Sequence, residues 1–282
     1  MLRRAYIEIT NICNLKCPFC PGTGRAARWM TAAEFAAAAA KIRPYTEYLC
    51  LHLMGEPLTH PELGEILGEA ERQGFSVTLT TNGILLPGRR DVLAPHPLYK
   101  ISVSLHAWEA NFGAEMTDAA RRYFGECFAF AAEAAAHGTI AALRLWNGDR
   151  ADRTGANTMN DAITALARDV FPGEWADTPR GIRLAQRVYI ENETIFDWPD
   201  ETAEARDGRA SCWGTRDHIG ILSDGTVVPC CLDHEGTIRL GNIFTDDLGG
   251  ILASRRVTAM REGFLRGEAV EPYCRRCGRV GK

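Results

Sequence analysis

Short apolar runs alternate with amphipathic or alanine-rich stretches through the first two thirds of the chain. The runs of strand character span 6–10, 47–53, 75–81, 100–105, 139–146 and 183–192. The helical stretches between them span 31–44, 60–73, 88–94, 117–137 and 158–169. Thr31 and Glu34 have the spacing of a capping box, and Gly138 directly follows the longest predicted helix. This alternation predicts a parallel α/β sheet, as an open doubly wound sheet or as a barrel.

The pattern changes near residue 199. Residues 199–210 are polar and charged, which predicts a linker between a first domain, 1–198, and a smaller second domain, 211–282. Within the second domain, 218–231 has the strand–Asp-Gly–strand pattern of a β-hairpin. A helical stretch at 246–263 follows it, so the second domain is expected to be a small α+β unit.

Three cysteines follow the first predicted strand at the spacing C-x3-C-x2-C: Cys13, Cys17 and Cys20. Cysteine thiolates at short loop spacings hold iron–sulfur clusters, and three of them leave one iron of a four-iron cubane open. From the residues alone, the alternatives are a zinc site and a set of disulfides. The chain has ten cysteines and lacks the apolar segment of a signal peptide near residue 1, which favours metal binding in a cytoplasmic protein.

The charge and the apolar runs of the chain indicate which kinds of partner it does not bind. The net charge is −4, and the basic residues form no stripe of the kind that nucleic-acid binders show, so nucleic acid is not an expected partner. No apolar run reaches the length of a membrane span, so we expect no membrane association.

The 282 residues suffice for a barrel smaller than the eight-stranded form, which takes about 250 residues, together with a small second domain.

The cysteine motif, with a strand before it and the aromatic Phe19 inside it, resembles that of the radical S-adenosylmethionine (radical SAM) superfamily. The resemblance implies a partial (β/α)6 TIM-like barrel with the active site at the C-terminal ends of the strands. It also implies a 4Fe-4S cluster on Cys13, Cys17 and Cys20, with SAM bound at the open iron. Reductive cleavage of SAM would give a 5′-deoxyadenosyl radical that removes a hydrogen atom from the substrate.

The same resemblance suggests residues for the SAM pocket. The sequence Met54–Pro57 resembles the family's GGE motif, so Gly55 and Glu56 are expected to bind the amino group of SAM, with Phe19 as a further contact. Ser102 and Ser104 share one face of the fourth strand and match positions that contact the ribose and carboxylate.

Two further residues have open roles. Arg144 lies among apolar residues and needs a buried partner, either the SAM carboxylate or an internal acid. His106 is either a proton-transfer group in the pocket or a structural hydrogen-bonding residue.

The last part of the chain holds a second cysteine set that resembles the SPASM/twitch domains of radical SAM proteins. The shared features are Gly225 to Cys230 (Gly-x-Val-x-Pro-Cys), the pair Gly241-Asn242 and a terminal C-x2-C. The spacing is close to that of the aminocyclitol dehydrogenases of butirosin biosynthesis. Four ligands for an auxiliary 4Fe-4S cluster are implied: Cys212, Cys230, Cys274 and Cys277. A four-cysteine zinc site is the alternative.

Three cysteines remain outside these sets. Cys231 should point away from Cys230 if the strand continues, and Cys50 and Cys127 are expected in the core.

The expected function is therefore a radical SAM oxidoreductase. A fully ligated auxiliary cluster has no open iron, so its implied role is to accept an electron. A small molecule is favoured as substrate over a ribosomal peptide, because the first strand begins near residue 5 with no recognition domain before it. Alternatives are a peptide maturase, a tRNA-modifying enzyme and a non-enzymatic iron–sulfur carrier. The expected reductant is of the flavodoxin or ferredoxin type.

Overall fold

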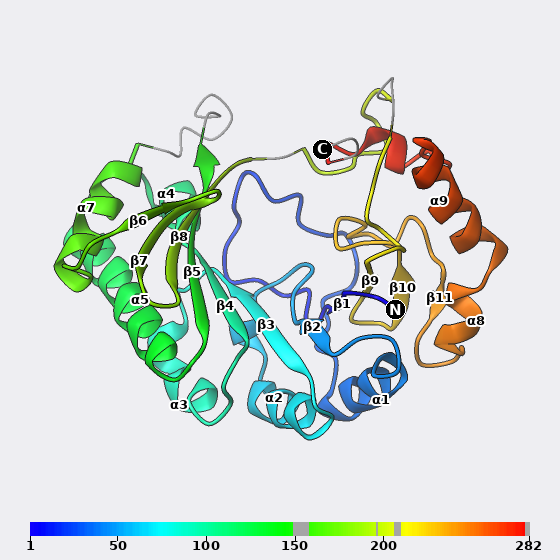
Figure 1. Ribbon diagram of the computed structural model, residues 1–282, viewed down its shortest axis with the longest axis horizontal. Coiled ribbons are helices and arrows are strands. Elements are labelled where there is room, and N and C mark those ends of the chain that lie inside the picture. Colours follow the sequence, from blue (N-terminus) through cyan, green and yellow to red (C-terminus); the bar gives the residue numbers. More distant parts are fainter. Residues whose placement is uncertain (149–157, 196, 206–209, 280–282) are drawn as a thin grey trace.

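One curved sheet organises the whole molecule. The computed structural model describes residues 1–148, 158–195, 197–205 and 210–279. Eleven strands follow the order β11-β10-β9-β1-β2-β3-β4-β5-β8-β7-β6. Figure 1 shows the sheet as an open arch, with helices on its convex side and the loop after β1 inside the arch.

Six of these strands form the barrel part. They are β1 (Arg4–Ile7), β2 (Tyr48–Cys50), β3 (Ser76–Thr81), β4 (Lys100–Ser104), β5 (Ile140–Gly148) and β8 (Val188–Thr194). Each pairs with the next in parallel. The intervening helices are α1 (Ala32–Ile42), α2 (Leu63–Arg72), α3 (Arg90–Leu93), α4 (His106–Phe112), α5 (Asp118–Ala136) and α7 (Asn160–Val170), with short 3-10 turns at Pro57–Thr59 and Leu86–Gly88. The partial (β/α)6 barrel is confirmed.

Local sequence explains how the first helix begins. The side chain of Thr31 accepts from the backbone of Glu34, and the Glu34 side chain accepts from the backbone of Thr31. This reciprocal pair satisfies two amides that would otherwise lack partners at the helix start. The predicted capping box is therefore present, and it ends the long loop that begins after β1.

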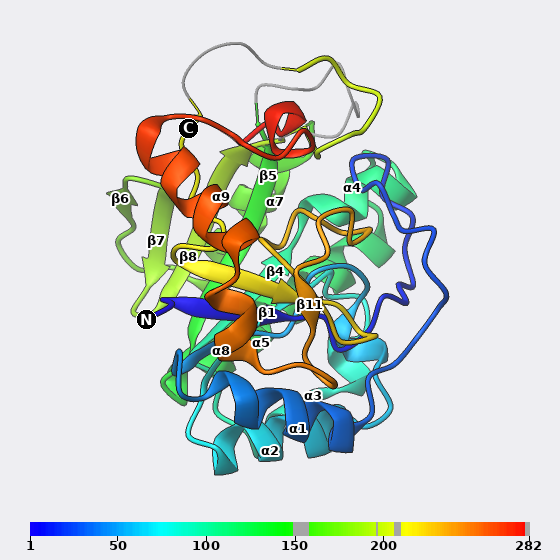
Figure 2. The ribbon, with the colours of Figure 1, turned by 90° about the vertical axis from the view of Figure 1, so that its right-hand side faces the viewer.

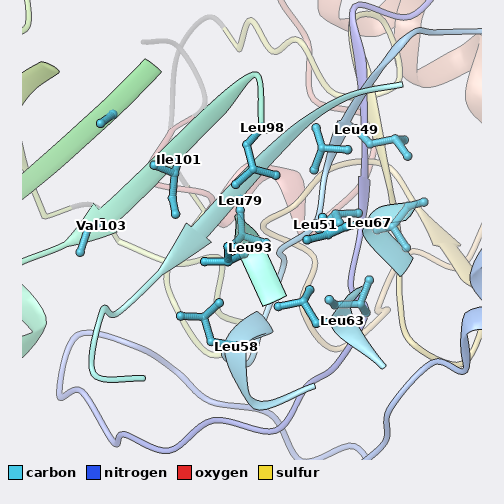
Figure 3. Close-up of a cluster of buried hydrophobic side chains, with 14 of the residues drawn as sticks. Leu49, Leu51, Leu58, Leu63, Leu67, Leu79, Leu93, Leu98, Ile101 and Val103 are labelled. Atoms are coloured by element: carbon cyan, nitrogen blue, oxygen red, sulfur yellow. The ribbon is translucent and has the colours of Figure 1, made fainter. Parts of the chain in front are cut away.

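Alternation along the strands separates the core from the inside of the arch. Leu49, Leu79 and Ile101 are fully buried and face the helices. Figure 3 shows this leucine-rich cluster, including Leu63 of α2 and Leu93 of α3. The intervening strand positions carry polar side chains on the other face. Because successive residues of a strand point to opposite faces, the polar positions line the inside of the arch.

Two predictions gave the right type of element but not its extent. The stretch 183–192 is not one strand but a hairpin, β7 (Gly181–Ala185) and β8, which turns at Arg187 with a φ of 64°. An arginine in the left-handed region gives no sequence signal of a turn. The stretch 246–263 is two helices, α8 (Leu248–Leu252) and α9 (Arg255–Arg266), because Ser254 caps the start of the second. The strand β6 (Ala176–Thr178) and the helix α4 were not predicted.

The predicted second domain joins the same sheet. Its hairpin, β9 (His218–Ile221) and β10 (Thr226–Val228), is confirmed, and β11 (Gly241–Asn242) pairs with β10. β9 pairs with β1 in parallel, so the hairpin extends the barrel sheet (Figure 2). Gly225 turns the hairpin with a φ of +84°, where a Cβ would lie 2.4 Å from the Phe244 ring. A last 3-10 turn spans Cys274–Arg276.

The domain boundaries remain a prediction, and residues 206–209 of the predicted linker lie outside the described residues. None of the helices in the described ranges combines the length and the apolar character that a bilayer span requires.

Candidate active site

The three cysteines of the first motif lie on the loop between β1 and α1, at the C-terminal end of β1. Cys13 and Cys20 are exposed and Cys17 is half-buried. The backbone amide of Cys20 donates to the carbonyl of Cys17 (3.0 Å), and the amide of Leu15 donates to Sγ of Cys13 (3.5 Å). The loop that carries these turns lies inside the arch (Figure 1).

Electrostatics shows that the three thiols share one site. The pKa of Cys17 is raised to about 11, chiefly by burial, and the nearby Cys20 and Cys13 raise it further. Burial also raises the pKa of Cys13 and of Cys20. Metal binding therefore has to displace protons from these thiols.

The turn after β2 lies directly against this loop. Gly55 has a φ of +75°, and a Cβ there would lie 2.4 Å from the carbonyl oxygen of Thr10. Only glycine permits this approach. The carboxylate of Glu56 accepts from the Thr81 hydroxyl and the Asn82 amide (2.7 Å each). Glu56 also accepts from the amide of Leu58 (3.0 Å), and burial raises its pKa to about 7. The Glu56 carboxylate therefore already accepts three hydrogen bonds from within the protein.

The predicted residues of β4 and β5 lie on neighbouring strands. Ser104 is in register with Arg144. Ser102 is fully buried, and its hydroxyl has no hydrogen-bond partner among the described residues. Arg144 lies over the ring of Trp146 (4.2 Å), and its Nε is 3.6 Å from Oε2 of Glu191. The internal acid that the sequence left open as an alternative partner is therefore present, and the contact with SAM stays a prediction.

His106 is buried at the start of α4. Its Nδ1 contacts the carbonyl oxygen of Arg144 (3.0 Å), and its ring lies 5.1 Å from that of Phe19 in the cysteine loop. Burial is the largest cause that lowers its pKa, to about 4. The ring is therefore neutral at pH 7 and packs against Phe19.

The four cysteines of the second set come together although they are far apart in the sequence. The thiols of Cys212 and Cys274 raise the pKa of Cys230, and the thiol of Cys277 raises the pKa of both Cys212 and Cys274. Burial raises the pKa of Cys230 well above its ordinary value. The backbone amide of Gly214 donates to Sγ of Cys212 (3.3 Å).

The remaining cysteines point elsewhere. Cys231 hydrogen-bonds to Tyr6 and lies near Cys50, and burial raises its pKa to about 12. Cys231 therefore faces Tyr6 and Cys50, as its omission from the cluster ligands predicted, but not by strand alternation, because β10 ends at Val228. Cys50 and Cys127 are buried, as expected. The described residues contain no group of three His, Cys, Asp or Glu side chains placed around a single metal ion. A four-iron cluster holds its cysteines more widely, because each thiolate binds a different iron.

Comparison with known families decides the identity of the first motif. Residues 7–138 match the model of the radical SAM superfamily, and residues 212–278 match that of an iron–sulfur cluster-binding domain of the SPASM type. The chain belongs to the radical SAM superfamily. It carries a C-terminal SPASM domain, and these two domains imply 4Fe-4S clusters and SAM as cofactors.

Two named proteins are similar to this chain in sequence, one over most of its length and one over about a third. The PqqA peptide cyclase of Ruegeria pomeroyi is 31% identical over 260 residues, which cover 79% of this chain and 66% of that protein. A probable GTP 3′,8-cyclase of Methanocaldococcus jannaschii is 32% identical over 108 residues, which cover 37% of this chain and 36% of that protein. The chain thus spans less than two thirds of these relatives.

Solved structures share the fold. BtrN in complex with AdoMet and 2-DOIA aligns with a TM-score of 0.60 and 14% identity, over 100% of this chain and 94% of BtrN. Streptococcus suis SuiB bound to its precursor peptide SuiA aligns with a TM-score of 0.61 and 15% identity, over 99% of this chain and 70% of SuiB.

The residues of this radical SAM protein fit the implied groups. The first loop offers three thiols, the number that leaves one iron open, and the second domain offers four. The backbone around Gly55 lies against residues 10–12, so the expected SAM-binding turn and the cluster loop meet at one place.

A cleft of about 1150 Å³ lies between the cluster loop and the SPASM domain. Phe19 and Cys20 line it from the cluster loop, and Trp198 lines it from the segment 197–205. His234 and Tyr273, from the SPASM domain, form the remaining side. Cys20 belongs to the first cysteine set, and Tyr273 directly precedes Cys274 of the second, so the cleft borders the first set directly and the second through Tyr273.

One residue that sequence reasoning missed joins these parts. Glu8 is fully buried just after β1, and its Oε2 accepts from Arg25 of the cluster loop (2.6 Å) and from the amide of Met54 (3.3 Å). Its Oε1 accepts from the amide and the hydroxyl of Ser223 in the SPASM hairpin (3.1 and 2.9 Å). Arg25 in turn donates to the carbonyl of His234 (2.8 Å). An acid two residues before Thr10 on a strand was the available signal.

Proposed function

We propose that this protein is a radical SAM oxidoreductase that removes a hydrogen atom from a C–H bond of a substrate held in the cleft between the two cysteine sites. The observation that carries the proposal is this cleft, since its walls come from both cluster-bearing segments. Cys13, Cys17 and Cys20 would hold the cluster that binds SAM, and this pair, once reduced by one electron from an external donor, would supply the radical that takes the hydrogen atom.

The chain's own residues account for the rest of the reaction. Phe19 and Trp198 offer apolar faces that hold the substrate and exclude water from the radical. After losing a hydrogen atom, the substrate must lose one electron and one proton to become the oxidised product. The auxiliary cluster on Cys212, Cys230, Cys274 and Cys277, whose neighbour Tyr273 lines the cleft, would take that electron. The neutral ring of His106, which packs against Phe19 of the cleft wall, would take the proton.

The substrate is a small molecule or a peptide, and one observation favours the peptide as a second candidate. The relative at 31% identity is a peptide cyclase. A small molecule, as in the neighbour that holds 2-DOIA, remains the expectation from the sequence.

The charge of the cleft argues against RNA. Its wall carries the carboxylates of Asp197, Asp200, Glu201, Glu204 and Glu235, against one arginine, Arg276. Phosphate backbones bind through Lys and Arg contacts. A substrate that is itself a polyanion would therefore be repelled from this surface.

The test is deuterium transfer under anaerobic conditions. The reconstituted protein is incubated with SAM, dithionite and one deuterated candidate at a time, a cyclitol amine or a synthetic peptide encoded by a neighbouring gene. Deuterium in 5′-deoxyadenosine, with a product two hydrogens lighter, supports the proposal. Deuterium transfer with a product of unchanged redox state would overturn the oxidation and leave the radical chemistry in place.

A further inference from the structure

The side-chain amide of Asn111 bridges α4 and the cluster loop. Its Nδ2 donates to Sγ of Cys17 (3.1 Å) and to the carbonyl oxygen of Ala107 one helical turn back (2.7 Å). Its Oδ1 accepts from the backbone amide of Lys16 (3.1 Å). Both N–H groups and the carbonyl of the amide are therefore in use.

These partners fix which way the amide points. The amide of Lys16 can only donate, and the carbonyl of Ala107 can only accept. A flipped amide would place its oxygen against the Ala107 oxygen and its NH2 against the Lys16 N–H. The Asn111 nitrogen must therefore face Ala107 and the sulfur of Cys17.

The side-chain amide of Asn82 makes a longer contact with another cysteine of the first motif. Nδ2 of Asn82, after β3, lies 3.9 Å from Sγ of Cys13 and donates mainly to Oδ1 of Asn14 (2.8 Å). The carbonyl of Asn82 accepts from the hydroxyl of Tyr123 (2.6 Å), which fixes its backbone. The shorter contact of Asn111 makes it the stronger donor of the two.

An N–H donor on a cluster sulfur stabilises negative charge there. Reduction adds one negative charge to the cluster and its thiolates, so the donor stabilises the reduced form more than the oxidised form. Hydrogen bonds to the ligand sulfurs therefore raise the midpoint potential of the cluster.

We propose that Asn111 is a positioning residue that raises the reduction potential of the SAM-binding cluster through its hydrogen bond to Cys17. The inference rests on the assignment of Cys17 as a cluster ligand. Because the same amide holds Lys16, it also fixes the loop to α4. The cluster of this chain is thereby easier to reduce by a weak physiological donor.

Two variants separate the hydrogen bond from the shape of the side chain. Asn111→Asp keeps the shape and the acceptor for Lys16 but removes the donor and adds a negative charge. Asn111→Leu removes donor and acceptor without adding charge. Asn160→Leu is the matched control, because the side-chain amide of Asn160, at the start of α7, exchanges hydrogen bonds with Asn147 of β5 (3.0 and 3.2 Å) and not with a cysteine.

The measurement is an EPR-monitored redox titration of each anaerobically reconstituted full-length protein. The SAM-binding cluster is identified as the signal whose shape changes when SAM is added. Asn111→Leu should shift its midpoint potential to a more negative value, and Asn111→Asp should shift it further. Asn160→Leu should leave the potential unchanged.

Three outcomes would overturn the inference or its basis. Equal potentials in wild type and both Asn111 variants, with iron retained, would overturn the tuning role alone. Loss of iron in both Asn111 variants but not in the control would show that Asn111 is needed for assembly, which also overturns it. The absence of any SAM-responsive signal in the wild type would instead overturn the assignment of the first cluster.

Discussion

The two cysteine sites of this radical SAM protein differ in exposure and in the groups that donate to their sulfurs. Cys13 and Cys20 of the first site are exposed, and side-chain amides from α4 and the end of β3 reach its sulfurs. In the second site Cys277 is buried and the other three cysteines are half-buried, and the backbone amide of Gly214 donates to Cys212. The thiols of the first site are therefore more accessible to a ligand and a reductant than those of the second. A site that must bind SAM needs this openness, and a site that only passes an electron does not.

The largest expected effect comes from removing one site at a time. Cys17→Ala should abolish SAM cleavage, because a three-cysteine loop has no spare ligand. The double variant Cys212→Ala, Cys274→Ala should keep SAM cleavage but lose substrate oxidation. Iron should fall from about eight to about four per chain in each case, since each site holds four irons.

The readouts are iron, sulfide and zinc content after anaerobic reconstitution, and 5′-deoxyadenosine formed with SAM and dithionite. Cys50→Ala is the control, because Cys50 is a buried thiol that belongs to neither set. About four irons in both the wild type and the double variant, with zinc lost only from the variant, would mean that the second site is structural.

A smaller effect is expected from the carboxylate that joins the two regions. Glu8→Gln leaves Arg25 without its buried counter-charge, and breaking such a pair typically costs about 3–5 kcal/mol. The free energy of unfolding of the metal-free protein, measured with urea, should fall by this amount.

The control for Glu8 is an exposed ion pair. Arg3 and Asp217 lie 3.4 Å apart with the Arg3 side chain 73% exposed, so Asp217→Asn should change the free energy of unfolding by no more than about 1 kcal/mol. Equal effects of the two substitutions would contradict the role given to Glu8.

The smallest expected effect is a difference in the rate of iron loss. An iron(II) chelator added to the reduced protein should remove the SAM-responsive cluster several times faster than the auxiliary one, because Cys13 and Cys20 are exposed. SAM should slow this first phase and leave the second unchanged. If both clusters are lost at the same rate, with or without SAM, the two sites are equally accessible and the expected difference between them is wrong.

The sequence allowed the fold class and the cysteine sets to be predicted because both depend on short-range patterns. The cysteine spacing of the first motif and the capping box at Thr31 involve residues close together in the sequence. The hairpin turn is marked by Gly225, which has a positive φ and follows an aspartate. The hairpin at Arg187 was missed, because its left-handed backbone is imposed by pairing with neighbouring strands.

The residues that position the site were missed for a different reason. Glu8 and Ser223 are 215 residues apart, and Asn111 and Cys17 are 94 apart. Polar residues such as these have many roles in a chain, and only folding shows which sulfur or amide they meet. The side-chain contacts predicted for SAM, including those of Ser102 and Arg144, remain predictions.

The parallel pairing of β9 with β1 has a consequence for synthesis of the chain. At roughly 5–20 residues per second, β1 leaves the ribosome on the order of ten seconds or more before residue 221 can pair with it. During that time one edge of the first strand has unpaired backbone groups, and Glu8 lacks Ser223 as a donor. Such an edge invites pairing with other chains. The nascent protein is therefore most vulnerable to aggregation before its last quarter emerges, and a truncated chain would keep that vulnerability permanently.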